Sequence, residues 1–190
     1  MNIGILALQG GYQAHINCLT KLGVFCSLVR DRRTLAASDA LILPGGESSV
    51  LIKLLKQYQL WTNLMDYDKP ILGTCAGAIL LAKSVLSPTQ DSLGRINICA
   101  TRNAYGRQLA SRVVNGHCVV RDLGMEMVFI RAPKLTLLDN TNIKVLAQYQ
   151  DQIVAVQENN IIAASFHPEL SQDNYLHRYF IQQVGCSSAV

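Results

Sequence analysis

The sequence predicts an α/β fold in which helices cover both faces of a doubly wound, mostly parallel sheet with an antiparallel extension in its C-terminal half. Two observations carry this prediction. Through residue 83, short apolar runs alternate with segments of helical periodicity. Beyond residue 95, short apolar runs follow one another with only tight polar connections. The 190 residues are 49% hydrophobic and contain no internal repeat and no flexible linker, so residues 1–190 are expected to form one domain.

Four apolar runs in the N-terminal half predict the parallel strands. They span residues 2–8, 24–29, 40–43 and 70–72. Polar residues, Gly or Pro bound each run, which is typical of turns. Apolar residues recur at helical spacing over 16–22 and 49–58, and a helix is expected in each of these segments.

The remaining elements follow from the same criteria. The strand at 70–72 leads into a glycine-flanked turn and a helix that is expected to run through Lys83. Residues 144–149, 152–157 and 161–166 predict three successive strands of an antiparallel meander. An amphipathic helix is expected from Asp173 to Val184, followed by a frayed tail over 185–190.

Composition and charge exclude several classes of protein. The six cysteines show no short paired spacing, and the N-terminal apolar stretch has no basic segment before it. A reduced, cytoplasmic location is therefore expected. No segment approaches the roughly 20 apolar residues of a membrane span. The net charge of +4 is not gathered into a basic stripe, since Asp31 interrupts the densest arginine cluster, residues 30–33, so nucleic-acid binding is not expected.

A candidate nucleophile lies between the fourth strand and the next helix. Residues 73–77 read GTCAG, a G-x-C-x-G pattern in which small residues permit a sharp strand-to-helix turn. Such a turn exposes the Cys75 thiol and places it at a helix N-terminus, where the helix dipole and free N–H groups favour the thiolate. The alternative is that Cys75 is a small core residue at a glycine-lined turn.

A candidate base and its orienting carboxylate lie together near the C-terminus. In an extended segment, residues i and i+2 project to the same side, so Glu169 can accept the Nδ1 proton of His167 and leave Nε2 facing the thiol. Pro168 fixes the backbone between them and suits the end of a strand. His15, His117 and His177 have no carboxylate at matching spacing and are interpreted as solvated or structural.

Two further patterns predict parts of a substrate site. Residues 44–49 read PGGESS after the third strand, and their paired glycines can turn backbone N–H groups toward a bound carbonyl. Together with the N–H of Ala76 they would form an oxyanion hole, although a Ser-capped Pro-Gly-Gly turn is also ordinary turn chemistry. Arg102 and Arg131 stand in neutral surroundings and offer the guanidinium fork that a substrate α-carboxylate needs, although either could be a surface arginine.

Together these residues resemble class I, triad-type glutamine amidotransferases, whose glutaminase domain is flavodoxin-like. Six ordered motifs are more narrowly similar to the PdxT/SNO family, the glutaminase subunit of pyridoxal 5′-phosphate synthase. They lie at residues 8–10, 43–48, 73–77, 102–108, 129–133 and 165–169. The resemblance covers nearly the whole chain, from Ile3 to the C-terminal helix.

The resemblance implies a role for each matching position. Cys75 would be the nucleophile, His167 the general base and then acid, and Glu169 its orienter. The residues implied to bind glutamine are Gly46, Glu47, Ser48, Arg102, Ile130 and Arg131. Gly46 and Ala76 would supply the oxyanion N–H groups. Gln9 would lie near the face that meets the synthase.

The same resemblance implies that the substrate is L-glutamine and that the partner is a PdxS/SNZ-type synthase subunit, with no metal or cofactor in this chain. Three alternatives stay open at this point. The chain could serve a different amidotransferase, it could be a cysteine hydrolase of the DJ-1/PfpI group, or it could be a non-catalytic regulatory subunit. The intact triad weighs against the last, and the two arginines weigh against the DJ-1/PfpI group.

Overall fold

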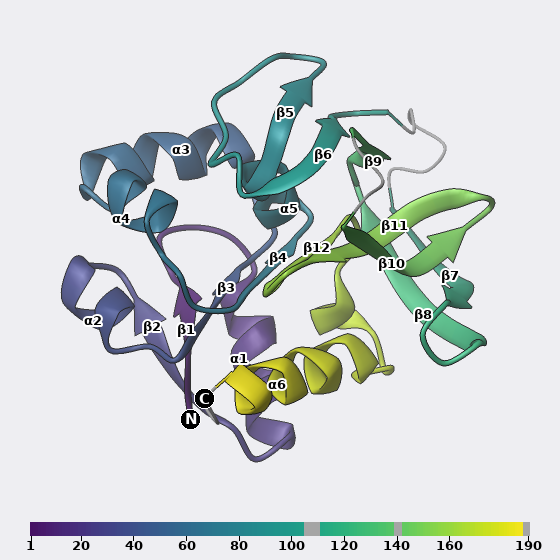
Figure 1. The fold of residues 1–190 in the computed structure, drawn as a ribbon, viewed down its shortest axis with the longest axis horizontal. Helices are drawn as coiled ribbons and strands as arrows, with labels where there is room; N and C mark the ends of the chain where they lie inside the picture. Colours follow the sequence, from purple (N-terminus) through teal and green to yellow (C-terminus); the bar gives the residue numbers. More distant parts are fainter. Residues whose placement is uncertain (105–110, 139–141, 188–190) are drawn as a thin grey trace.

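The computed structural model describes residues 1–104, 111–138 and 142–187, and its centre is a nine-stranded mixed sheet (Figure 1). Its strand order is β2-β1-β3-β4-β12-β11-β10-β7-β8. These strands are β1 (Asn2–Leu6), β2 (Phe25–Val29), β3 (Ala40–Leu43), β4 (Ile71–Thr74), β7 (Ser111–Cys118), β8 (Leu123–Ile130), β10 (Ile143–Tyr149), β11 (Gln152–Glu158) and β12 (Ile161–Ala164). The strands from β2 to β12 in this order are parallel, and those from β12 to β8 are antiparallel. The mixed α/β fold predicted from the sequence is thus confirmed.

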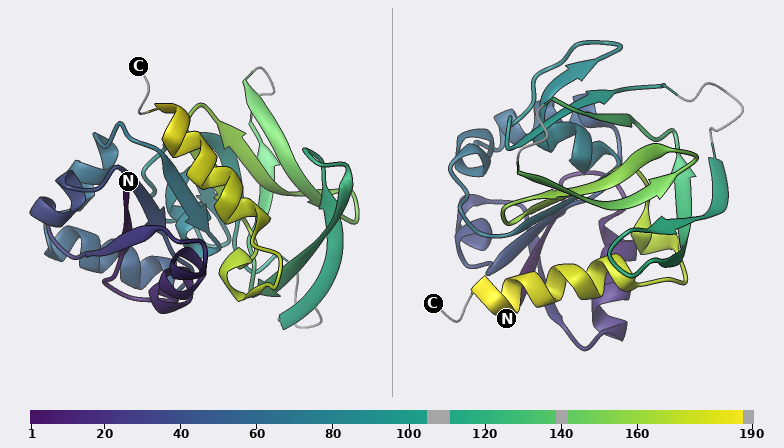
Figure 2. Two further views of the ribbon diagram at one scale, coloured as in Figure 1. Left: turned by 90° about the horizontal axis from the view of Figure 1, so that it is seen from below. Right: turned by 45° about the vertical axis from the view of Figure 1, so that its right-hand side comes forward.

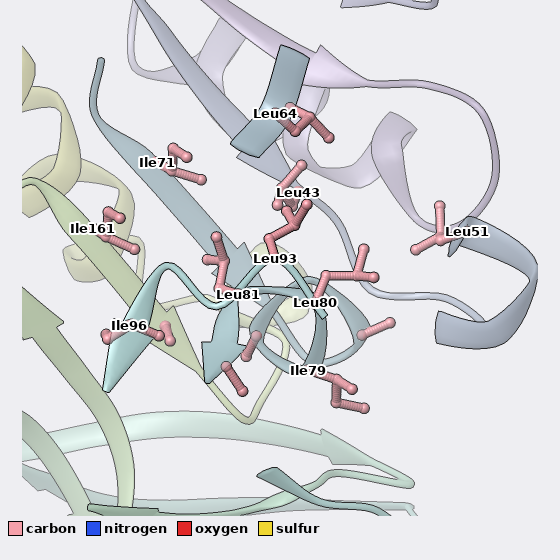
Figure 3. Packing of buried hydrophobic residues seen from close by; sticks show 14 of the residues in the cluster. Leu43, Leu51, Leu64, Ile71, Ile79, Leu80, Leu81, Leu93, Ile96 and Ile161 are labelled. Atoms are coloured by element: carbon pink, nitrogen blue, oxygen red, sulfur yellow. The ribbon is translucent and has the colours of Figure 1, made fainter. Parts of the chain in front are cut away.

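Helices cover both faces of the parallel half, as a doubly wound sheet requires. They are α1 (Tyr12–Lys21), α2 (Arg32–Ala36), α3 (Ser48–Gln57), α4 (Trp61–Met65), α5 (Ala76–Leu81) and α6 (Tyr175–Ser187). On one face, apolar side chains of α2 to α5 pack with Leu41 and Leu43 of β3; Figure 3 shows part of this cluster. On the other face, side chains of α1 and α6 pack with Ala40 and Ile42 of the same strand. Figure 2 shows the backbone of these two helices from two further directions. Successive residues of β3 therefore face opposite cores, which explains its continuous apolar run.

A smaller sheet was not predicted. It contains β5 (Ala82–Leu86), β6 (Ile96–Thr101) and β9 (Lys134–Leu137) in the order β5-β6-β9. The helix expected to continue through Lys83 instead ends at Leu81, and β5 begins at the next residue. The segment before β6 explains why α5 ends at Leu81, because the N–H groups of Leu93 and Arg95 donate to the carbonyls of Leu80 and Leu81. Carbonyls that are satisfied in this way no longer favour another helical turn.

Other element boundaries also differ from the prediction. The strand expected at 2–8 ends at Leu6, the one expected at 161–166 ends at Ala164, and the first helix starts at Tyr12. The last helix extends to Ser187, so residues 185–187 are helical rather than frayed, and residues 188–190 lie outside the described part. The short helices α2 and α4 and the β7–β8 hairpin were not predicted from the sequence.

Two general expectations can be compared with the structure. All six cysteines lie in the described ranges, and each is a free thiol. None of the described helices combines the length and the apolar character that crossing a bilayer demands.

Candidate active site

Cys75 occupies a strained turn between β4 and α5. Its backbone φ is 49°, in the left-handed region that non-glycine residues rarely adopt. The Cys75 N–H donates to the carbonyl of Ala164 at 2.8 Å, which anchors the turn to the neighbouring strand β12. A Cβ at Gly77 would collide with the carbonyl oxygen of Leu43, so only glycine allows this close approach of α5 to β3. The turn thus has the geometry of a nucleophile elbow.

His167 lies beyond the end of β12, beside the elbow. Its Nδ1 is 2.7 Å from Oε1 of Glu169, and both side chains are almost fully buried. The contact does not arise from an extended segment as the sequence interpretation assumed, because Pro168–Leu170 forms a 3-10 helix, η2, which turns Glu169 back onto the imidazole. A Cβ at Gly45 would stand 2.9 Å from His167 Nδ1 and 3.3 Å from Cys75 Cβ. Gly45 therefore borders both groups.

The electrostatics of the three residues are coupled. Burial alone would lower the pKa of His167, but hydrogen bonds and charge interactions with Cys75 and Glu169 outweigh it and raise this pKa to about 10. Burial alone would raise the pKa of Glu169, but interactions with His15 and His167 outweigh it and lower this pKa. These shifts favour a protonated imidazole held by a charged Glu169 carboxylate beside Cys75.

A cavity of about 200 Å³ opens over the thiol and brings together most of the predicted site residues. It is lined by Gln9, Gly46, Glu47, Ser48, Cys75, Ile79, Arg102, Asn103, Ile130, Arg131 and His167. Glu169 stands behind His167, and Ala76 is the first residue of α5. This volume is below the roughly 300–1,000 Å³ of sites for drug-sized ligands and suits a single small metabolite.

Gln9 closes one side of the cavity next to the PGGESS loop. Its side-chain Oε1 accepts a hydrogen bond of 3.0 Å from the N–H of Glu47. The same oxygen would lie 2.5 Å from a Cβ at Gly46, so a side chain at that position would displace Gln9. Gln9 thus holds the backbone of the loop from which the predicted oxyanion donor Gly46 comes.

Arg102 lines the cavity and belongs to a polar network. Its Nη2 pairs with Glu47 Oε1 at 3.1 Å, and its Nη1 donates to Gln90 Oε1 at 2.8 Å. The same Gln90 oxygen accepts a bond of 3.0 Å from Ser48 Oγ. Gln90 was missed by the sequence interpretation, because an isolated glutamine in a polar loop carries no motif. Residues 106–108, part of the motif that begins at Arg102, lie outside the described residues.

Ile130 and Arg131 reach the cavity from the end of β8. The carbonyl oxygen of Ile130 is 3.7 Å from Cys75 Sγ and accepts its S–H. Arg131 has a backbone φ of 46°, a strained conformation of the kind that clusters at functional sites.

His15 and His177, which were interpreted from the sequence as solvated or structural, adjoin the proposed triad. Both are completely buried. His15 Nε2 lies 3.4 Å from Oε2 of Glu169, and His15 Nδ1 lies 3.0 Å from Nε2 of His177. Their sequence separation of 162 residues left no local pattern to reveal this. His117, in contrast, is half-exposed on the β7–β8 hairpin, 3.4 Å from Asp122.

Metal binding can be assessed over the same part of the chain. Within residues 1–104, 111–138 and 142–187, no three His, Cys, Asp or Glu side chains are grouped to hold a metal ion.

Comparison with known proteins agrees with this geometry. Residues 5–186 match the model of the SNO glutamine amidotransferase family. The chain is 42% identical over 187 residues to "Pyridoxal 5′-phosphate synthase subunit PdxT" of Thermosipho africanus, covering 97% of this chain and 99% of the relative. It is 44% identical to the protein of the same name from Methanocorpusculum labreanum, covering 97% and 98%.

Solved structures give the same result at the level of the fold. A crystal structure of a glutamine amidotransferase superposes with a TM-score of 0.89 at 38% identity, covering 96% of this chain and 98% of the other. A putative GMP synthase protein from Thermoplasma acidophilum shares the fold at a TM-score of 0.71 and 19% identity, covering 99% and 96%. The family model, the relatives and the elbow geometry agree: the chain belongs to the SNO glutamine amidotransferase family.

Proposed function

We propose that this chain is the glutaminase subunit of a pyridoxal 5′-phosphate synthase, which releases ammonia from L-glutamine with Cys75, His167 and Glu169. The strained elbow of Cys75, next to a buried imidazole–carboxylate pair, is the single observation that carries the chemistry. Near-full-length relatives named as subunits of that synthase support the pathway over a different amidotransferase. We treat residues 1–190 as one glutaminase domain.

The first half-reaction forms a thioester. The Cys75 thiolate attacks the side-chain amide carbon of glutamine, and the carbonyl electrons move onto oxygen. The N–H groups of Gly46 and Ala76 stabilise this oxyanion. His167, protonated and held by Glu169, donates its Nε2 proton to the departing nitrogen as the carbon–nitrogen bond breaks. Ammonia and a glutamyl thioester result.

The second half-reaction restores the enzyme. Neutral His167 takes a proton from water, which attacks the thioester carbonyl through a second oxyanion in the same backbone site. The carbon–sulfur bond breaks, glutamate leaves and the thiolate–imidazolium pair is regenerated. The low pKa of Glu169 keeps its carboxylate charged through both halves, so it stabilises each imidazolium without taking the proton.

In this proposal the part of the cavity beside Arg102 binds the α-amino and α-carboxylate groups of glutamine. Arg102 is held by Glu47 and Gln90 and presents a cation for the α-carboxylate. Ser48 and Arg131 provide further polar contacts, and the carbonyl of Ile130 faces the reacting centre. This division puts recognition at one end of the cavity and chemistry at the other.

The partner in this proposal is a PdxS/SNZ-type synthase subunit in the cytoplasm, a reducing compartment that suits six free thiols. Ammonia that passes directly to the synthase escapes protonation in bulk water. Gln9, which holds the Glu47 N–H at the cavity wall, is positioned to respond to docking of the partner. Docking would then raise glutamine hydrolysis by completing the site.

The test is release of glutamate from glutamine by the wild type and by Cys75→Ala, each with and without a pyridoxal 5′-phosphate synthase subunit. Cys186→Ala, which removes an exposed thiol of α6, is the matched control. We expect activity that needs Cys75, tolerates Cys186→Ala and rises strongly with the partner. Activity that ignores this partner would refute the pathway, and release that persists in Cys75→Ala would refute the mechanism.

A further inference from the structure

A chain of buried polar side chains continues behind Glu169. His15 comes from α1, His177 from α6 and Thr74 from β4, directly before the nucleophile. His15 Nδ1 lies 3.0 Å from His177 Nε2, and His15 Nε2 lies 3.2 Å from Thr74 Oγ1 and 3.4 Å from Glu169 Oε2. His15 therefore touches both the residue that precedes Cys75 and the carboxylate that orients His167.

The position of the proton on each ring follows from satisfying these groups. Glu169 Oε2 is buried without a hydrogen-bond partner in the described residues, and His15 Nε2 lies 3.4 Å from it. A carboxylate only accepts, so His15 carries its proton on Nε2 and uses Nδ1 as an acceptor. His177 must then donate from Nε2, which leaves its Nδ1 as a lone pair without a partner in the described residues. The reverse assignment would bury an unpaired N–H and turn a lone pair toward Glu169.

Burial keeps both rings neutral. Burial lowers the pKa of His15, against the charge of Glu169, and lowers the pKa of His177 to about 3. The titratable groups that act on the two rings are Glu169 and His167 near η2, together with each other. With these tautomers the neutral His177 ring donates to His15, and His15 donates to Thr74 while the same Nε2–H stays 3.4 Å from Glu169 Oε2.

We propose that His15, oriented by His177, is a positioning residue that holds the Glu169 carboxylate against His167. This inference rests on the proposed glutaminase function. Glu169 Oε1 engages His167, whereas its buried Oε2 makes no hydrogen bond and has only the Nε2–H dipole of His15, 3.4 Å away, to stabilise its charge; without His15 it would lose that dipole. The carboxylate would then turn toward water, and His167 would lose the partner that fixes its tautomer and stabilises its charge.

The positioning role predicts a loss of turnover and not of binding. His15 and His177 do not line the cavity over Cys75. In a complex with a synthase subunit, His15→Leu should lower kcat for glutamine hydrolysis by roughly 10- to 100-fold and leave KM within about twofold. The alkaline limb of kcat/KM should move to lower pH, because His167 without an engaged Glu169 loses its proton more readily.

Two variants and a control separate positioning from folding. His15→Gln retains an N–H near the place of Nε2 and should recover most of the lost kcat, whereas His177→Leu should lie between His15→Leu and the wild type. His117→Leu is the matched control, because it removes an imidazole that also lies 3.4 Å from a carboxylate but is exposed. Far-ultraviolet circular dichroism and thermal unfolding establish that each variant is folded at the assay temperature.

A second readout does not depend on turnover. Iodoacetamide alkylates thiolates, and peptide mass spectrometry follows Cys75 separately from the other five cysteines. At pH 7 alkylation of Cys75 should slow severalfold in His15→Leu and remain unchanged in His117→Leu. Wild-type kcat, alkylation rate and pH profile in folded His15→Leu would overturn the inference, as would equal losses in His15→Leu and His15→Gln accompanied by a raised KM.

Cys75→Ala measured beside these variants distinguishes the two possible failures. If Cys75→Ala abolishes glutamate release while His15→Leu matches the wild type, only the positioning role is wrong. If release is unaffected by Cys75→Ala, the proposed function itself is wrong.

Discussion

At the scale of single residues, the site depends on Gly45 as much as on the side chains that react. Gly45 faces the imidazole of His167 and the Cβ of Cys75, in a space that no larger residue can share. It also accepts a hydrogen bond from the N–H of Gly11 at the start of α1. The approach of His167, the proposed base, to Cys75, the proposed nucleophile, is therefore set by a missing side chain.

Gly45→Ala is expected to abolish most glutamine hydrolysis without unfolding the chain. The added methyl would stand 2.9 Å from His167 Nδ1 and push the ring away from Cys75. A displacement of about 1 Å at a reacting group can cost on the order of 100-fold in rate. Steady-state glutamate release is the measurement, with Gly185→Ala as control, since that glycine of α6 has room for a methyl. Wild-type turnover in Gly45→Ala would contradict this account.

Gln90 is expected to affect the binding of glutamine and not the chemical steps. Gln90→Leu removes the acceptor shared by Ser48 and Arg102. A hydrogen bond to a charged group contributes about 1.5–3 kcal/mol, so KM for glutamine should rise roughly 10-fold or more while kcat changes little. Initial rates over a range of glutamine concentrations test this, with the exposed Gln57→Leu as control. A fall in kcat at constant KM would show that Gln90 serves the chemistry instead.

Residues with local patterns could be predicted from the sequence, and those without could not. Glycines flank Cys75, and Glu169 follows His167 by two positions, so each motif is visible within a few letters. Gln90 and His15 have no such neighbours. They join the site only because separate strands and helices converge there, which is tertiary information that one sequence does not display.

At the scale of elements, Arg95 joins α4 to the start of β6. Its guanidinium donates to the carbonyls of Leu64, Met65 and Tyr67 at 2.9, 2.8 and 2.7 Å. Two of these carbonyls belong to the last residues of α4, which have no partner within the helix. A helix of five residues depends on such external bonds.

Arg95→Lys should lower the free energy of unfolding by about 1–3 kcal/mol, because one ammonium cannot reproduce the planar fork over three carbonyls. Urea denaturation followed by circular dichroism measures the change, and Lys53→Arg, on the exposed side of α3, is the control. The kcat of the folded variant should equal that of the wild type, since Arg95 does not line the cavity. An unchanged urea midpoint would show that these bonds contribute no net stability.

Strands formed by continuous apolar runs were predictable, and element boundaries that depend on tertiary pairing were not. The continuous apolar runs of β3 and β4 indicated strands buried on both faces, and the structure confirms them. The first residues of β5 continue the apolar pattern of α5, which is why the sequence predicts a longer helix there. Only pairing with β6 makes that segment extended, and that pairing depends on the whole fold.

At the scale of the whole molecule, the pH dependence of stability is set by buried histidines whose pKa values are shifted in opposite directions. His15 and His177 have lowered pKa values in the folded state, whereas the pKa of His167 is raised to about 10. An unfolded histidine titrates near a pKa of about 6.5. The free energy of unfolding therefore depends on His15 and His177 below that pH and on His167 above it.

The free energy of unfolding is expected to be greatest near a pH of about 6.5. Below it the unfolded chain binds protons that folded His15 and His177 refuse, so stability falls on acidification by up to roughly 1.4 kcal/mol per pH unit for each ring. Above it the folded chain retains the His167 proton that the unfolded chain loses, so stability falls as pH rises toward 10.

Urea titrations between pH 5 and 9 measure this profile. His177→Leu should flatten the acidic side and leave the alkaline side unchanged, because it removes one ring with a lowered pKa. His117→Leu, which alters an exposed ring, is again the control. A wild-type acidic slope in His177→Leu would show that this ring does not carry the effect.

The pairing of β12 with β4 has a consequence for the order of events during synthesis. β12 lies between β4 and β11 and brings His167 to Cys75 from a distant part of the sequence, with Ala164 aligned to Thr74. A nascent chain that has folded only as far as β4 therefore carries a thiol without a base and a sheet edge without a neighbour. Residues through Glu169 must therefore be synthesised before the proposed triad can make ammonia, so a chain that stops short of them has no means of wasting glutamine.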